Sequence, residues 1–294
     1  MASIRAGHPP GEAFRVLARK TLTAAAKDLK AVGVGGSVHL ARKRLKFMRS
    51  LLRFIRHALG RRNFKTANSR LRSAAAVLAA ARRAEALQQA VVRLQADQEV
   101  LLPELAELAS IAIQVHGERA TPAALQVATA EARRIVATVR GDVAHWPLAK
   151  RDMGLFLRGL TDAYGRARRK LLEGLSSGGI ATLHEARKSV IHHLHQLEML
   201  KPLWPGMIRM WAGELLKLRE ALGDLNDLDE LEALAIGQGP RFSSDAARDH
   251  VLQAIAARRA NLVNRVRGQA DHLFAEKPKA FARRIGAMWQ VMLA

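Results

Sequence analysis

The sequence predicts an all-α fold, a helical bundle built from two pseudo-symmetric repeats of about four to five helices each. Alanine, leucine, arginine and glutamate dominate its periodic segments, and alternating runs of β-branched residues are missing. Apolar residues recur at steps of three and four between Val38 and Leu59, which is the spacing of one buried helix face. A chain of 294 residues with 49% hydrophobic content can bury a substantial core around such helices.

Glycine, serine and proline mark the helix boundaries of the first half. A glycine-rich run precedes Ser37, a favourable N-cap residue, and Gly60 ends the same segment. Thr121 and Pro122 open a later helix, because proline suits the first helical turn. The helices expected in this half span residues 11–31, 37–59, 63–81, 83–116 and 122–143.

In the second half, glycine, serine and proline mark helix boundaries in the same way. Serines and glycines at 176–179 precede the helix that carries His184, and Pro205 separates the next pair of helices. Asn226 or Asp227 is expected to cap the helix that follows. The helices expected here span residues 149–174, 180–200, 206–222, 226–236, 244–268 and 276–291.

Both halves are expected to share one compact domain over residues 8–292. Only a short proline break, His145 to Leu148, lies between them, rather than a long flexible linker. Similar histidine-led segments occur in both halves at an offset of about 145 residues. We therefore interpret the chain as an internal duplication, with one repeat at about 8–145 and the other at about 149–292.

A stripe of basic residues runs beside the apolar face of the helix predicted at 37–59. At about 100° per residue these residues fall within roughly a quarter-turn, so they form one charged edge. The stripe consists of His39, Arg42, Lys46, Arg49, Arg53 and Arg56, and a shorter copy contains His184, Arg187 and Lys188. Such an edge suits a linear polyanion; the alternative is a solvated helix face.

The net charge also favours an acidic partner. The chain carries 48 Lys+Arg against 26 Asp+Glu, a balance of +22, which attracts nucleic acid, phosphate polymers or anionic membranes. Arginine suits bidentate contact with phosphate oxygens. No apolar run is long enough to span a membrane and the N-terminal segment has no apolar signal region, so we expect a cytoplasmic protein.

No pattern of an active site is recognisable. Cysteine is absent, which excludes thiolate metal sites, and there is no P-loop, nucleophile elbow or kinase signature. His192 and His195 share a helix face while His193 points elsewhere, which makes a poor metal site. Asp224 and Asp227 could bridge a divalent ion, but helix capping and ion pairs with basic helices are favoured. We expect no enzyme activity, no cofactor and no metal.

Aromatic residues are scarce, at 4% with one tyrosine, so a base-stacking platform has little to build from. This scarcity counts against a protein specialised for single-stranded nucleic acid. The four tryptophans are expected in the core or between helices: Trp146, Trp204, Trp211 and Trp289.

Several segments resemble signatures of the CHAD family, the conserved histidine α-helical domain. Residues 38–43 and 183–188 resemble its H-x-x-R motif, and residues 218–228 resemble its L-G-x-x-x-D-L segment. Tyr164 with Arg166, Arg168 and Arg169 resembles its Y-x-R-x-R helix. The resemblance runs from about residue 10 to about residue 270.

This resemblance implies a non-catalytic helical bundle that binds inorganic polyphosphate. The implied contacts are His39, Arg42, Lys43, Lys46, Arg49, Arg53, His184, Arg187 and Lys188, with Arg158, Arg166 and Arg169 as further candidates. His39 and His184 either touch phosphate or orient neighbouring arginines. Where the family usually has a basic residue, this chain has Ile191 followed by histidines. If those histidines replace the missing charge, binding should strengthen as the pH falls through about 6.5.

Other functions compatible with the sequence are non-specific RNA or DNA binding and an accessory or phosphatase role in polyphosphate processing. A structural role on polyphosphate granules, with a matching location, is a further expectation. The sequence leaves open whether the protein forms oligomers.

Overall fold

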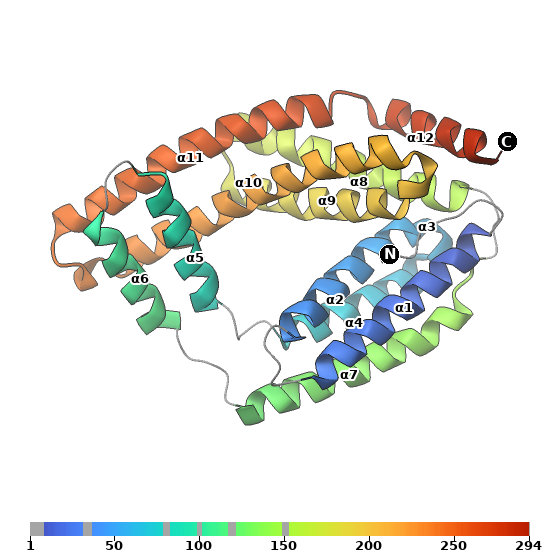
Figure 1. The fold of residues 1–294 in the computed structure, drawn as a ribbon, viewed down its shortest axis with the longest axis horizontal. Helices are drawn as coiled ribbons and strands as arrows, with labels where there is room; N and C mark the ends of the chain where they lie inside the picture. Colours follow the sequence, from blue (N-terminus) through green and yellow to red (C-terminus); the bar gives the residue numbers. More distant parts are fainter. Residues whose placement is uncertain are drawn as a thin grey trace.

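Helices make up the regular structure of this protein. The computed structural model describes residues 9–31, 37–78, 83–98, 102–116, 122–148 and 153–293. Within these residues there are helices and no strand, so the predicted all-α fold is confirmed. They form two groups and a two-helix arm (Figure 1).

The first group is a four-helix bundle in which each helix packs against two of the others. Its members are α1 (Pro10–Lys30), α2 (Ser37–Phe54), α4 (Arg61–Ala76) and α7 (Pro122–Asp142), the last followed by the 3₁₀ turn η2 (Val143–His145). The short α3 (Arg56–Leu59) follows α2, and Gly60 then takes a φ of 77° before α4 begins. The apolar stripe of α2 is buried inside this bundle as its spacing predicts, at Ala41, Leu45, Met48 and Leu52.

The second group contains the C-terminal helices. A second ring is formed by α8 (Gly154–Ser177), α9 (Ile180–Met199), α10 (Pro205–Gly237) and α11 (Asp245–Leu273), while α12 (Pro278–Leu293) packs on α8. Gly178 ends α8 in the left-handed conformation, with a φ of 63°. The 3₁₀ turns η3 (Lys201–Leu203) and η4 (Gly239–Arg241) flank α10. Both rings connect their helices in the same order, whereas the predicted duplication itself stays a prediction.

The arm consists of α5 (Arg83–Ala96) and α6 (Pro103–His116), which pack against α10 and α11 of the second group (Figure 1). Its buried side chains include Leu94 and Leu108. Polar contacts add to this packing: Glu107 accepts a hydrogen bond from the Ser243 backbone N–H at 2.9 Å. A segment that precedes α7 in the sequence thus lies on the C-terminal helices.

Three predicted helix assignments are wrong. Residues 83–116 form α5 and α6 rather than one helix, because Pro103 lacks a backbone N–H and begins a new helix. Residues 206–222 and 226–236 form the single helix α10. The polar stretch that resembled a break is held helical by burial of Leu225 and Leu228. The helix predicted at 37–59 is also interrupted, at Ile55.

Three of the four tryptophans agree with prediction. Trp146 and Trp289 are buried, and the half-buried Trp211 packs against Phe281. Trp204 is 55% exposed, so its assignment to the core is wrong. It lies immediately before α10, outside the buried faces of the helices.

The two groups meet where α2 packs against α8 and α9. Phe54 of α2 stacks on Phe156 of α8 with ring centroids 4.6 Å apart. Gly159 makes the approach of the backbones possible, because a Cβ there would lie 2.1 Å from the carbonyl oxygen of Phe54. This close crossing places the basic edge of α2 beside the C-terminal helices.

Candidate anion-binding surface

The basic stripe of α2 lies along the contact between the two groups of helices. Its side chains are partly or well exposed there, while the neighbouring apolar stripe is buried. Arginines of α8, α9 and α10 lie close to it. We call this surface the basic seam; it comprises Arg42, Lys46, Arg49 and Arg53 of α2, Arg166 of α8, Arg187 of α9 and Arg219 of α10.

Electrostatic repulsion within the basic seam indicates how close its cations lie. Burial lowers the pKa of Lys46, and four arginines lower it further: Arg42, Arg187, Arg219 and Arg49. Burial lowers the pKa of Arg53 to about 10, with smaller contributions from Arg49, Arg166 and Arg56. These cations repel one another, and a polyanion bound among them would reduce that repulsion.

A neutral side chain orients two of these arginines. The Asn68 Oδ1 accepts hydrogen bonds from Arg49 Nε at 3.2 Å and from Arg53 Nη1 at 3.1 Å. An amide oxygen fixes the guanidinium groups without neutralising their charge. Asn68 is not among the residues predicted from the sequence, since no motif on α4 singles it out. Arg219 is not among them either, although it lies inside the segment that resembles L-G-x-x-x-D-L.

Arg187 reaches the basic seam across a glycine of α10. A Cβ on Gly223 would lie 3.3 Å from both Nε and Nη2 of Arg187. The Nε is buried and has no hydrogen-bond partner among the described residues. Burial lowers the pKa of Arg187, while Asp227 and Asp224 oppose that shift. Gly223 therefore leaves the space that the guanidinium occupies.

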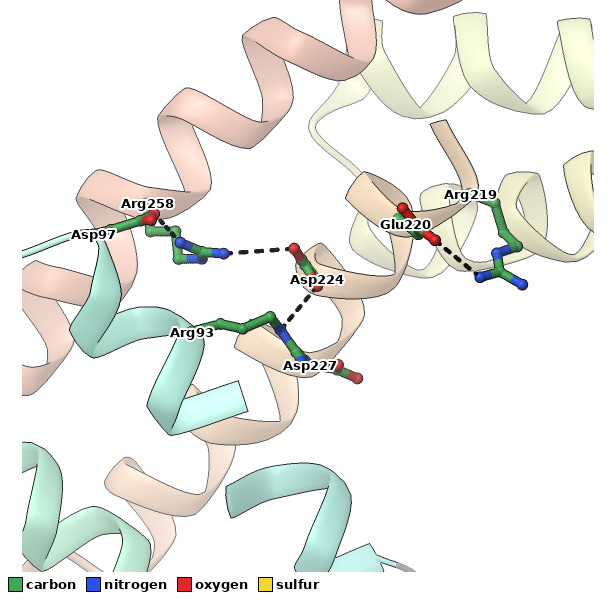
Figure 2. A network of polar contacts seen from close by, with 7 residues as sticks. All are labelled: Arg93, Asp97, Arg219, Glu220, Asp224, Asp227 and Arg258. Carbon is green, nitrogen blue, oxygen red and sulfur yellow. Dashed lines mark hydrogen bonds and ion pairs between the residues drawn. The ribbon is translucent and has the colours of Figure 1, made fainter. Parts of the chain in front are cut away.

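Asp224 and Asp227 belong to an ion-pair network between α5, α10 and α11 (Figure 2). Arg93 lies 3.2 Å from Asp224 and 2.7 Å from Asp227, and Arg258 contacts both Asp224 and Asp97. The predicted ion pairs with basic helices are confirmed, but the predicted capping is wrong because α10 continues through both residues. The network ties the arm to the C-terminal helices.

Other predicted contacts lie outside the basic seam. Lys188 pairs with Glu185 at 2.6 Å and Arg169 with Glu173 at 3.6 Å, each along its own exposed helix face. Arg56 lies on α3 and pairs with Asp162 at 3.0 Å. The remaining exposed candidates are His39, Lys43 and Arg158. Exposed pairs of this kind contribute little to stability, so the paired cations could exchange partners.

His184 has acidic neighbours. It lines a cavity of about 700 Å³ together with Glu185, Asp229 and Glu230. Its Nδ1 is buried without a hydrogen-bond partner in the described part of the chain. The two histidines that lead the stripes therefore differ, since His39 is exposed at the start of α2.

The three clustered histidines divide between two environments, as their spacing predicts. His193 is fully buried between Tyr164 and Phe281, and burial lowers its pKa to about 3. His192 and His195 both meet Ser50 of α2. Burial and neighbouring cations lower the pKa of His195 to about 4 and that of His192 well below 6.5.

These pKa values limit one expectation from the sequence to the bound state. In the free protein the three histidines stay neutral near pH 6.5, so they add no positive charge to the surface at that pH before an anion binds. The expected rise of affinity with falling pH stays a prediction. Among the described residues no group of three His, Asp or Glu side chains is placed to hold a metal ion.

A family model covers the helices that supply the basic seam. The CHAD domain model matches residues 16–236 of the 294-residue chain. The chain belongs to the CHAD family. The match includes α2, α8 and α9 and all but the last residue of α10, which supply every residue of the basic seam. The CHAD family is associated with polyphosphate binding in general. No similar curated protein and no similar solved structure was found for this chain.

None of the helices in the described ranges is both long and apolar enough to cross a membrane.

Proposed function

We propose that this CHAD protein binds long inorganic polyphosphate along the basic seam and performs no chemistry on it. The observation that carries the proposal is the convergence of cations from α2, α8, α9 and α10 on one surface, where they repel one another. A linear polyanion can offset this repulsion at several points. Arg49 and Arg53 are already oriented by Asn68, which lowers the entropy lost on binding.

The strength of binding should depend steeply on salt. By analogy with single-stranded nucleic acid, each neutralised phosphate contributes about −0.7 to the slope of log affinity against log salt. Arginine adds bidentate hydrogen bonds to phosphate oxygens, which are stronger than contacts between neutral groups. Several contacts along one chain would therefore produce a slope of several units.

A charge-matched pair of variants tests the site. Arg42→Ala with Arg49→Ala removes two seam cations, and we expect polyphosphate affinity near physiological salt to fall about tenfold or more. The control, Arg133→Ala with Arg134→Ala, removes the same charge from an exposed part of α7. Fluorescence titration with long-chain polyphosphate measures both. Equal losses in the two variants would show that net charge, rather than the basic seam, supports binding.

Non-specific nucleic-acid binding is the second candidate, favoured by the balance of +22. A competition titration separates the two functions. We expect polyphosphate to displace RNA at matched phosphate concentration, and the reverse order of affinity would favour the nucleic-acid function. Release of orthophosphate in the presence of magnesium or manganese would instead indicate an enzyme.

A further inference from the structure

A buried hydroxyl joins two histidines beside the basic seam. Ser50 of α2 is fully buried, and its Oγ lies 2.8 Å from His192 Nδ1 and 2.9 Å from His195 Nδ1. The same Oγ lies 3.1 Å from the carbonyl oxygen of Lys46. Gln196 adds a weaker contact to the Ser50 carbonyl at 3.4 Å. Polar groups from α2 and α9 thus meet within one cluster, which we call the Ser50 cluster.

Hydrogen-bond counting limits the Ser50 cluster to two kinds of protonation pattern. A serine hydroxyl has one proton and two acceptor lone pairs. When Ser50 donates to the Lys46 carbonyl, both imidazoles must donate to Oγ from Nδ1–H. When Ser50 donates to one imidazole instead, the other still donates from Nδ1–H. At least one neutral ring therefore has an unprotonated Nε2 that can accept a proton.

The doubly protonated cluster also satisfies its hydrogen bonds. Two imidazolium Nδ1–H groups then donate to the two lone pairs of the Ser50 Oγ, and the Ser50 hydroxyl still donates its own hydrogen bond to the Lys46 carbonyl oxygen. Starting from the pattern in which both rings donate from Nδ1–H and Ser50 donates to the Lys46 carbonyl, protonation at Nε2 breaks none of these contacts. What opposes protonation is burial together with the surrounding positive charge.

The charges facing each ring come from every helix packed against it. His192 faces Arg53 and Arg49 of α2 and Arg166 of α8, besides His195. His195 faces Arg219 of α10 and two lysines of α2, Lys43 and Lys46. The carboxylate of Glu198 lies near the same lysine and arginine, Lys43 and Arg219, and burial raises its pKa.

We propose that polyphosphate bound along the basic seam is taken up together with protons, which add to Nε2 of His192 and His195. The proposal rests on the proposed function and specifies how that site is regulated. Bound phosphates place negative charge among the cations that now oppose protonation, so they favour the imidazolium form. Each proton comes from solvent and adds a positive charge and an N–H donor. His192 and His195 thus become positively charged only when the anion is bound.

Calorimetry with wild-type protein tests the proposal. Long-chain polyphosphate is titrated into the protein at about pH 6.5 in two buffers with different ionisation enthalpies, such as MES and Bis-Tris. We expect the heat of binding to differ between buffers, corresponding to uptake of up to about two protons per occupied seam. Affinity should rise as the pH falls, by at most about tenfold per pH unit for each proton taken up.

Asparagine substitutions test whether His192 and His195 take up the protons. Asparagine keeps a polar atom near the position of Nδ1 but cannot be protonated at neutral pH. We expect His192→Asn with His195→Asn to abolish most of the proton uptake while retaining binding at about pH 8, where the wild type gains least from protonation. The control is His272→Asn, an exposed histidine of α11, which should leave the uptake unchanged.

The possible outcomes separate this proposal from the proposed function. Binding with a buffer-independent heat would overturn proton uptake and leave polyphosphate binding intact. Absence of binding in both buffers would overturn the proposed function itself. If the asparagine variant fails to fold, imidazole ¹⁵N NMR of the wild-type protein decides, since ring nitrogens unchanged on adding polyphosphate would contradict the proposal.

Discussion

Single residues decide how the charges of the basic seam are presented. Asn68 orients two guanidinium groups without a negative charge, and the Ser50 hydroxyl joins two imidazoles across the contact between the helix groups. Gly223 acts through the absence of a side chain, because a Cβ there would lie only 3.3 Å from Nε and Nη2 of Arg187. The chemistry of the surface therefore depends on neutral residues as much as on cations.

Gly223→Ala should weaken polyphosphate binding because the added Cβ would lie only 3.3 Å from Nε and Nη2 of Arg187 and so force the guanidinium group to shift. We expect an affinity loss of about threefold to tenfold, the scale of one displaced hydrogen-bonding group. The free energy of unfolding should change little, since the helix propensity of alanine offsets the crowding. The matched control is Gly213→Ala on the same helix, where no atom lies within 4 Å of the added Cβ. Equal affinities of the two variants would contradict the role of Gly223.

Helix packing brings the seam residues together. The crossing of α2 over α8 and α9 aligns the basic edge of α2 with Arg166 and Arg187. The arm formed by α5 and α6 packs against α10, where Arg93 pairs with Asp224 and Asp227 (Figure 2). The same two carboxylates lie near Arg187, where they oppose the lowering of its pKa by burial.

Gly159→Ala should destabilise the contact between α2 and α8. The new Cβ would lie 2.1 Å from the Phe54 carbonyl oxygen, so the two helix backbones must separate. We expect the free energy of unfolding, measured by urea denaturation, to fall by about 1–3 kcal/mol. Gly141→Ala on α7 has open space and serves as the control. If Gly159→Ala unfolded at the same urea concentration as the wild type, the helices would accommodate the added Cβ without loss of stability.

For the whole molecule, the neutral histidines predict a loss of stability in acid. The unfolded chain binds protons at its histidines below about pH 6.5, whereas folded His193 and His195 do so only near pH 3 and pH 4. Because the unfolded state binds more protons, the free energy of unfolding falls as the pH drops below 6.5. Each such histidine contributes up to about 1.4 kcal/mol per pH unit.

Urea denaturation between about pH 7 and pH 5 measures this loss. Replacing the fully buried His193 by leucine should make the free energy of unfolding depend less steeply on pH, by the equivalent of about one bound proton. The exposed His145→Asn variant is the control and should keep the wild-type slope. A stability that does not vary with pH over this range would contradict the neutral state of these histidines.

The sequence by itself determined the helical class, the buried stripe of α2 and the basic edge beside it, because each depends on periodicity within one helix. The family resemblance was equally local, carried by short motifs. Helix ends were less predictable where packing prevails over local signals, as in α10, whose polar Gly-Asp-Asn stretch stays helical.

Only the tertiary structure decided that cations from separate helices form one surface, that Asn68 and Arg219 belong to it, and that His192 and His195 meet Ser50. It also placed the arm on the C-terminal helices. These contacts join residues far apart along the chain, and their distances and pKa values depend on how helices cross rather than on spacing within any one helix.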